Sequence, residues 1–260
     1  MATQLGVRAE RLLEVRALLT AKGRRQSGRF AFEGATLLHE ARRSGAVVDE
    51  IYATGEAYER DTLVREFESA GTPVYVVEPR SMAKISGLET PPGILAIGRM
   101  RAVALDQLFA ADGVILTIAD LNDPGNEGTL LRSAESFGCR GAVVGRLGAD
   151  PYHPKVVRAA MGSSFRLPVA VADPSEVAQA SADGGFEVVG LSADGERLDR
   201  HSWASRTAIV VGHERHGLGR WESLCAKRLA IPMPGSTESL NAAIAGSIAL
   251  YEAAKSPAFE

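Results

Sequence analysis

Residues 207–251 constrain the fold of this chain more than any other stretch, because strand, loop and helix signals follow one another there at short intervals. An apolar, β-branched run at 208–211 stops at Gly212 and gives way to a polar loop with the sequence HERHGLG. A second apolar run at 229–233 is interrupted by prolines, and an apolar stripe at helical spacing begins at Leu240. Two strand ends and a helix start therefore lie close together in sequence. In parallel α/β sheets, the carboxyl ends of strands are where ligands bind.

The residues before this stretch alternate short apolar runs with helical patterns. The run at 113–121 is almost continuously apolar, which is typical of a parallel strand covered on both faces. Further strands are predicted at 142–145, 167–172 and 186–193, and helices directly after 121, at 154–163 and at 174–182. This alternation predicts a doubly wound sheet of the nucleotide-binding type.

The first hundred residues alternate in the same way and predict a separate, compact α/β sandwich. A helix is predicted at 8–22, followed by a break at 23–29. Strands are predicted at 29–34, 47–53, 73–77 and 94–100, and helices at 35–45, 56–70 and 81–87. The patterns place a small domain at 1–100, a linker at 101–112 and a larger domain at 113–260.

The composition is that of an ordinary soluble globular protein, with 45% hydrophobic and 23% charged residues in a chain of 260. No apolar run approaches the roughly 20 residues of a membrane span, and no secretory signal is indicated. The two cysteines form no C-x-x-C pair, which argues against a metal site or a disulfide scaffold. A cytoplasmic location is therefore expected.

Charge is distributed unevenly along the chain. The net charge is −3, which does not by itself suggest a nucleic-acid partner, but residues 1–30 contain seven basic and two acidic side chains. Such a cluster is either a solvated helix face or a surface that contacts phosphate.

The common nucleotide-binding motifs are absent. No G-x-G-x-x-G follows a predicted strand, and the glycines at 23 and 28 are not followed by the Lys-Ser/Thr of a P-loop. A dehydrogenase or an NTPase is therefore disfavoured.

Three short motifs lie in order along the second half of the chain. The first consists of Asn126, Gly128 and Arg132, the second of GHE at 212–214 with Gly-Leu at 217–218, and the third of IPM at 231–233 with ESLN at 238–241. This set resembles the motifs of the SpoU (TrmH) family of RNA ribose 2'-O-methyltransferases, which belong to the SPOUT superfamily. The second motif departs from the family at Arg215 and His216, because family members commonly carry a small residue after the glutamate.

The resemblance implies a fold, a cofactor and partners. The larger domain would be a SPOUT α/β domain whose carboxyl-terminal segment forms a trefoil knot, and family members are homodimers through this domain. The cofactor would be S-adenosylmethionine, and no metal is required. The sequence at 29–34, RFAFEG, looks like the opening of a small substrate-binding domain similar to certain RNA-binding ribosomal proteins. The expected partner is RNA, with no role for a membrane.

By resemblance, four residues carry the chemistry: Asn126, Arg132, Glu214 and Asn241. Methyl transfer needs a fixed donor, a fixed ribose and a proton acceptor. Arg132 is expected to clamp the RNA phosphate beside the target ribose; family members have been proposed to use this arginine as the base, although a guanidinium holds its proton firmly. Glu214 would orient Arg132 or Asn126, and Asn241 would support Arg132 or the ribose.

Each of these residues also has a purely structural interpretation. Asn126 is placed as the N-cap of the helix that follows it, and Asn241, like Ser239, as a cap of the last helix. On a helical projection Arg132 points away from Leu130 and Ala134, as a solvated arginine would.

The cofactor pocket is implied by the second and third motifs together with GLSADG at 190–195. The residues expected to line it or contact the cofactor are Leu191, Gly212, Ile231, Met233, Ser239 and Leu240. Backbone groups would make the hydrogen bonds while apolar side chains shield the adenine ring.

The function expected from this sequence is an S-adenosylmethionine-dependent RNA 2'-O-methyltransferase. Ribosomal RNA is favoured over tRNA because of the additional amino-terminal domain. The alternatives are a tRNA ribose methyltransferase and a noncatalytic RNA-binding assembly factor with a vestigial pocket.

Overall fold

The computed structural model of the chain describes residues 2–6, 10–101, 103–213, 216–237 and 239–256, and these form two compact units. Unit 1 consists of residues up to Met100 together with Tyr152–Phe165, and unit 2 consists of Arg101–Pro151 and the residues from Arg166 onward.

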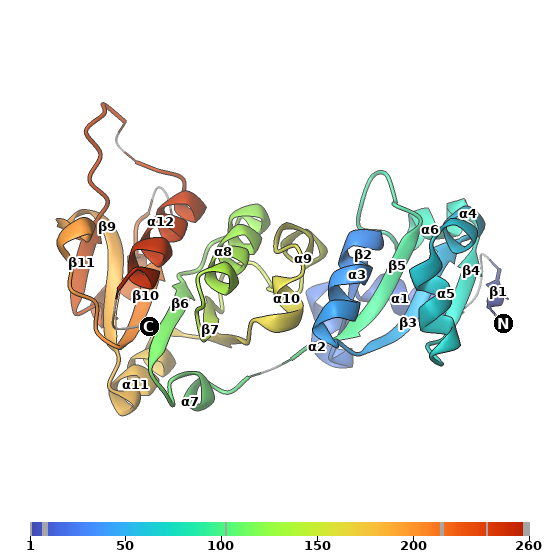
Figure 1. The fold of residues 1–260 in the computed structure, drawn as a ribbon, viewed down its shortest axis with the longest axis horizontal. Helices are drawn as coiled ribbons and strands as arrows, with labels where there is room; N and C mark the ends of the chain where they lie inside the picture. The colour runs from blue at the N-terminus through green and yellow to red at the C-terminus, as the bar shows by residue number, and fades with distance from the viewer. Residues whose placement is uncertain (1, 7–9, 102, 214–215, 238, 257–260) are drawn as a thin grey trace. The chain divides into compact units, whose positions relative to one another are not determined.

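Unit 1 contains a five-stranded mixed sheet in the order β1-β4-β3-β5-β2 (Figure 1). Strands β1, β4 and β3 are parallel, whereas β5 runs antiparallel to both β3 and β2. The strands are β1 (Thr3–Leu5), β2 (Arg29–Glu33), β3 (Val48–Thr54), β4 (Val74–Val77) and β5 (Ile94–Arg99). The helices are α1 (Glu10–Ala17), α2 (Ala21–Ser27), α3 (Ala35–Ser44), α4 (Gly55–Arg60), α5 (Thr62–Ser69), α6 (Pro79–Ile85), α9 (Pro154–Ala159) and α10 (Ser163–Arg166), which ends one residue past the unit.

Alternating side chains of this sheet enter two separate cores. Phe30 and Phe32 of β2 pack with α3, α4, α5 and α9, while Ala31, between them, packs with α1 and α6. This period of two is what a strand covered on both faces requires. Unit 1 is therefore a three-layer α/β/α structure.

The later part of unit 1 completes one of these cores with aromatic rings. The ring of Tyr152 lies 4.9 Å from that of Phe30, and the ring of Phe165 lies 4.9 Å from that of Phe32, measured between centroids. Tyr152 and Phe165 lie within residues 113–260, the stretch that the sequence analysis assigns to the larger domain.

Unit 2 is built on a six-stranded sheet that is parallel throughout, in the order β11-β9-β10-β6-β7-β8. The strands are β6 (Gly113–Ile118), β7 (Gly141–Gly145), β8 (Val169–Ala172), β9 (Glu187–Arg197), β10 (Arg206–Val211) and β11 (Lys227–Ala230). The helices are α7 (Leu105–Leu108), α8 (Pro124–Ser136), α11 (Pro174–Gly184) and α12 (Ala242–Ala254), with 3-10 turns η1 (Leu198–Arg200) and η2 (Gly219–Leu224). The chain builds the sheet from β6 outward to β8 and then returns to the other side of β6. Ligand sites of doubly wound sheets lie at such a reversal.

Helices α8 and α12 lie side by side in unit 2 (Figure 1) and approach closely through a glycine. A Cβ atom placed on Gly246 of α12 would lie 2.4 Å from Leu130 Cδ2 of α8 and 3.0 Å from Val211 Cγ2 of β10. The hydroxyls of Ser133 and Ser247 meet at 2.7 Å across the same interface. The small residues of α12 at this interface thus permit its close packing against α8.

The sequence predictions fail mainly at helix boundaries in unit 1. The predicted helix at 8–22 is two helices, because Thr20 caps α2 by accepting a hydrogen bond from Gly23 N at 3.1 Å. The predicted break at 23–29 is wrong, since α2 continues to Ser27. Gly23 lies within α2. Only glycine fits at this position, because a Cβ atom there would lie 2.1 Å from the carbonyl oxygen of Ala17. Strand β1 was not predicted at all.

Two further predicted helices are interrupted. Asp61 divides 56–70 into α4 and α5 by capping the second of them through Leu63 N. The helix predicted at 154–163 ends at Ala159, and positive φ angles at Met161 and Gly162 separate it from α10.

No helix among the described residues is long and apolar enough to cross a lipid bilayer.

The contact at Gly246 generates a prediction about stability. Gly246→Ala should lower the free energy of unfolding by about 1–3 kcal/mol, because the added methyl overpacks a buried interface. Gly55→Ala is the matched control, since a Cβ at Gly55 meets no atom within 4 Å. Urea denaturation of the two variants measures the difference. Equal stability of the two variants would contradict the packing described here.

Candidate active site

One pocket of unit 2 lies where β9, β10 and β11 meet the start of α12. It has a volume of about 270 Å³. All six residues that the sequence predicts for the cofactor site line it: Leu191, Gly212, Ile231, Met233, Ser239 and Leu240. The structure thus brings together segments separated by about fifty residues of sequence.

The loop that follows β10 is shaped by a short turn. His213 N donates to Gly217 O at 2.9 Å, and Gly217 N donates to His213 O at 2.8 Å, which closes the turn. A Cβ atom at Gly212 would lie 2.2 Å from Gly217 O, so only glycine permits this approach. Gly212 and Gly217 therefore contribute only backbone atoms to the pocket lining.

The lining suits a ligand with a flat apolar part and polar edges. Leucine, isoleucine and methionine side chains supply apolar walls, while Gly212 and Gly217 leave backbone close to the pocket and Ser192 and Ser239 add hydroxyls. Ligand sites commonly combine apolar walls with a few placed polar groups in this way. The residues present therefore fit S-adenosylmethionine, the cofactor that the motifs imply.

Asn126 and Asn241 are in direct contact. Asn241 Nδ2 donates to Asn126 Oδ1 at 3.0 Å. Asn241 is the N-cap of α12, as the sequence predicts, because its Oδ1 accepts from Ala243 N and Ile244 N at 2.9 and 3.2 Å. The residues on either side of Asn241, Leu240 and Ala242, both line the pocket. The asparagine pair therefore lies beside it.

The predicted capping role of Asn126 is wrong. Asp123 is the N-cap of α8, and its Oδ1 accepts from Asn126 N at 2.7 Å. Pro124 fits the first helical position, where its missing N–H costs nothing, so the helix begins before Asn126. The amide side chain of Asn126 is consequently available to meet Asn241.

Arg132 lies on the exposed side of α8, while Leu130 and Ala134 of the same helix are fully buried. This is the orientation that the helical projection predicts. Among the described residues, Arg132 has no hydrogen-bond or ion-pair partner. The structure therefore does not bring it into contact with Asn241, and it leaves the guanidinium accessible to an external anion.

Glu214, the remaining predicted catalytic residue, lies outside the described residues, as does Arg215. Of the neighbouring histidines, His213 lines the pocket and His216 is exposed, with their ring centroids 4.8 Å apart.

Arg8 lies outside the described residues, and the other basic residues near the amino terminus do not form one continuous phosphate-binding surface. Arg24 is 1% exposed and donates to Leu18 O at 2.8 Å, so its role is to hold the α1–α2 turn. Arg11 and Arg29 both pair with Glu50, at 2.9 and 3.1 Å. The exposed members without such pairing in the described part of the chain are Arg16, Lys22 and Arg25.

Glu127, next to Asn126, is the most unusual carboxyl group of this region. Its side chain is completely buried, and neither oxygen has a hydrogen-bond partner among the described residues. Burial, together with the nearby charge of Asp150, raises its pKa to about 9. Glu127 is therefore protonated at neutral pH.

Comparison with known proteins gives the family. Residues 113–251 match the sequence profile of the SpoU rRNA Methylase family, and residues 10–96 match the MRM3-like substrate binding domain. The chain belongs to the SpoU rRNA methylase family. The SpoU methylase match contains most of unit 2 together with Tyr152–Phe165 of unit 1, and the substrate-binding match lies within unit 1.

Individual SpoU relatives extend the similarity over most of the chain. The 23S rRNA (guanosine(2553)-2'-O)-methyltransferase RlmP of Bacillus subtilis (strain 168) is 30% identical and covers 93% of this chain and 95% of its own length. The 23S rRNA (uridine(2479)-2'-O)-methyltransferase of Streptomyces viridochromogenes is 36% identical over 64% of this chain, and that match spans 61% of the relative. The crystal structure of the SpoU methyltransferase AviRb from Streptomyces viridochromogenes, in complex with the cofactor AdoMet, has a TM-score of 0.84 at 30% identity and covers 95% of this chain and 98% of its own.

Sequence reasoning did not anticipate Glu127. It also did not anticipate Asp120, which binds Arg220 and Trp221 just after the loop of the second motif at 212–218, called the second-motif loop below. Each is a common acidic residue in a loop or a first helical turn, where carboxylates are usually solvated. Only Glu127 has a sequence feature that could have indicated its burial, because it comes directly before Gly128 of the first motif, which is also buried.

Glu127 predicts a pH dependence of stability. Its pKa is about 4.5 in the unfolded chain and about 9 in the folded one, so between these values only the folded state holds the proton. The free energy of unfolding should therefore fall as pH rises across this window, by about 1.4 kcal/mol per pH unit from this residue. Glu127→Gln, which cannot ionise, should remove that slope when urea denaturation is followed from pH 6 to 8.

The control for this experiment is Glu89→Gln, which changes an exposed carboxylate. An unchanged pH slope in the Glu127→Gln variant would show that the carboxyl is not buried as a neutral acid.

Proposed function

We propose that this chain transfers a methyl group from S-adenosylmethionine to the 2'-hydroxyl of a ribose in ribosomal RNA. The observation that carries the proposal is the pocket lined by all six predicted cofactor residues, with the Asn126–Asn241 pair beside it. Membership of the SpoU family supports the reaction class, and relatives named as 23S rRNA 2'-O-methyltransferases support the substrate.

The roles of the pocket residues follow from their chemistry. Leu191, Ile231, Met233 and Leu240 would enclose the cofactor, and Ser239 and the backbone of Gly212 would bind its polar edges. When bound, S-adenosylmethionine supplies an electrophilic methyl group on a sulfonium centre. The chain must then hold a ribose hydroxyl against that group and remove its proton.

The asparagine pair and Arg132 would bind and orient the nucleotide whose ribose is methylated. Asn126 Oδ1 is tied to Asn241, which fixes both side chains at the start of α12 and beside the pocket. Arg132, exposed and without a partner in the described part of the chain, would bind the phosphate next to the target ribose. A guanidinium suits this task because it remains charged and presents several donors. Glu214 would orient these groups.

The chain path of unit 2 supports the trefoil knot implied by the resemblance. After β10 the chain forms β11 on the far side of β9 and then returns to α12, which packs against α8 and β10. We infer that this return passes through a loop of the domain.

The function is tested by labelling RNA with S-adenosylmethionine that carries an isotopic methyl group. Ribosomal RNA and tRNA purified from cells without this enzyme are the two substrates, and mass spectrometry locates the methylated ribose. Label in rRNA supports the proposal. Label confined to tRNA would favour a tRNA methyltransferase. No label in either RNA would favour a noncatalytic assembly factor.

Arg132→Ala should lower the rate of methyl transfer by at least about 100-fold, because the ribose would no longer be held in line with the methyl group. Binding of S-adenosylhomocysteine, measured by calorimetry, should stay unchanged. Arg132→Lys should retain part of the rate if phosphate binding is the role, since lysine keeps the charge. Arg200→Ala, at another exposed arginine of unit 2, is the control. A parental rate in Arg132→Ala would refute the assigned role.

We also infer that the chain forms a homodimer through the outer faces of α8 and α12. Ile244 is 53% exposed and Tyr251 is 51% exposed, and with Phe137 and Ile248 they line a shallow apolar groove. Exposed apolar surface of this kind marks an interaction site.

Ile244→Glu should therefore convert the dimer to a monomer, because a charge would be buried at the interface. Sedimentation velocity at micromolar concentration measures the change. Leu13→Glu, at a 67% exposed leucine of unit 1, should leave the dimer intact. A monomeric parent protein would overturn the inference.

A further inference from the structure

Asp120, directly after β6, has an unusual backbone. Its φ angle is +52°, in the left-handed region that residues other than glycine rarely adopt. Gly145 at the end of β7 makes room for it, because a Cβ there would lie 2.3 Å from Asp120 Oδ1 and 2.7 Å from Asp120 N. Such a conformation persists only where the surroundings enforce it, and it commonly marks a functional position.

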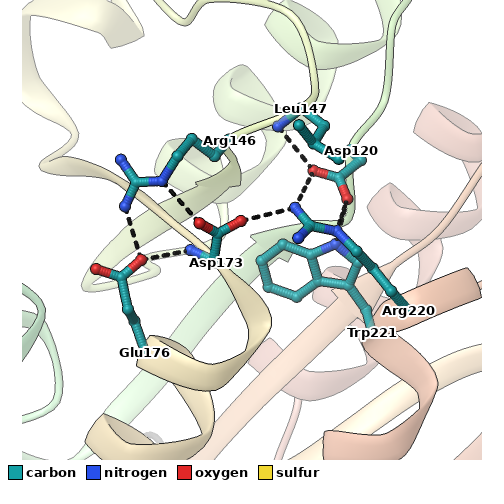
Figure 2. A network of polar contacts seen from close by, with 7 residues as sticks. All are labelled: Asp120, Arg146, Leu147, Asp173, Glu176, Arg220 and Trp221. Atoms are coloured by element: carbon teal, nitrogen blue, oxygen red, sulfur yellow. Dashed lines mark hydrogen bonds and ion pairs between the residues drawn. The ribbon is translucent and has the colours of Figure 1, made fainter.

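The carboxylate of Asp120 accepts hydrogen bonds from three residues, as Figure 2 shows. Trp221 Nε1 and Arg220 Nε donate to Oδ2 at 2.7 and 2.8 Å. Arg220 Nη2 and Leu147 N donate to Oδ1 at 3.3 and 3.1 Å. Both oxygens are thus occupied, and the carboxylate is held from two segments of the chain, one at Leu147 and one at Arg220 and Trp221.

Burial by itself would raise the pKa of Asp120, but the hydrogen bonds from Arg220, Trp221 and Leu147 outweigh that effect and lower it. Asp120 is therefore charged at neutral pH and is a strong acceptor.

Trp221 is the largest fully buried side chain among the described residues and belongs to the core of unit 2. Its indole N–H is a donor that needs a partner when buried, and Asp120 supplies it. Leu218, in the same segment, is also buried and packs against β9, where a Cβ on Gly190 would lie 2.5 Å from Leu218 Cδ1. The end of the second-motif loop is thus fixed by Leu218 and by the Trp221–Asp120 bond.

This loop has its other end in the cofactor pocket. It leaves β10 at Gly212, and Gly212, His213 and Gly217 line the pocket. Four residues after Gly217 the chain reaches Trp221. The position of the pocket wall therefore depends on where Trp221 is held.

Asp120 also begins the connection that leads to the asparagine pair. Three residues later, Asp123 caps α8 and binds Asn126 N. A single carboxylate thus joins the loop that forms the cofactor pocket to the loop that positions Asn126.

The outer part of the same network is solvent-exposed. Arg220 Nη2 also donates to Asp173 Oδ1 at 2.8 Å, and Asp173 and Glu176 both pair with Arg146 (Figure 2). The Asp173 side chain is 35% exposed, whereas that of Asp120 is 19% exposed. Exposed ion pairs contribute little, so Asp173 provides a matched control for Asp120.

We propose that Asp120 is a positioning residue of the methyl-donor site: by binding Trp221 and Arg220 it holds the second-motif loop in the shape that binds S-adenosylmethionine. This inference rests on the proposed function, because it concerns the same pocket. Asp120 itself lies outside the pocket lining and acts through Trp221 and the loop.

The test uses the full-length chain with Trp203→Phe, which leaves Trp221 as the one remaining tryptophan of two. In this background Asp120→Gly removes the carboxylate and suits the positive φ, Asp120→Asn keeps the shape without the charge, and Asp173→Asn is the control. Calorimetry measures the Kd for S-adenosylhomocysteine, acrylamide quenching measures access to Trp221, and steady-state assays separate KM for S-adenosylmethionine from kcat.

In Asp120→Gly we expect the Kd and the KM for the methyl donor to rise about tenfold while kcat stays within about threefold of the parent, because the loop is loosened and the reacting groups are unchanged. Quenching of Trp221 should increase. Asp120→Asn should show smaller effects of the same kind, and Asp173→Asn should match the parent.

Parental Kd and quenching in both Asp120 variants would overturn this inference alone. A parent protein that does not bind S-adenosylhomocysteine would overturn the proposed function instead. If Asp120→Gly does not fold, Asp120→Asn carries the same comparison, and a parental KM in that variant would count against the role.

Discussion

The arrangement of this protein's candidate site depends on the hydrogen bond between Asn241 and Asn126. The side-chain oxygen of Asn241 caps α12 by accepting hydrogen bonds from two backbone N–H groups. The side-chain NH₂ group of Asn241 donates to Asn126. Helix α8, which carries the first motif, and helix α12 are thereby joined at their amino-terminal ends. Their bodies pack closely through Gly246. Because the residues flanking Asn241 line the pocket, the same bond fixes this wall of the pocket next to Asn126.

Much of the fold is readable from patterns of hydrophobicity. Strands such as β6 and β10 are continuous apolar runs because both faces of their sheet are covered, and β2 alternates between two cores. The pocket residues could be named because the second and third motifs resemble those of the SpoU family. The structure brings these motifs and residues 191–193 to one place at the sheet.

The positions that sequence reasoning misjudged are those set by local competition or by tertiary contact. Asp123 and Asn126 can both cap a helix, and the proline between them decides in favour of Asp123. Gly23 resembles a helix breaker, yet its missing side chain is what lets α2 turn against α1. The burial of Glu127 and the backbone angle of Asp120 depend on neighbours distant in sequence, which no local pattern encodes.

The chain passes between its two units more than once. It leaves unit 1 after Met100, comes back for Tyr152–Phe165, and then returns to unit 2 for the remainder. A fragment that stops near residue 100 would therefore lack the rings that cover Phe30 and Phe32, and would expose part of an aromatic core to water. The amino-terminal unit is thus not a detachable module, and its core is completed only after β6 and β7, two of the six strands of the unit 2 sheet, have been synthesised.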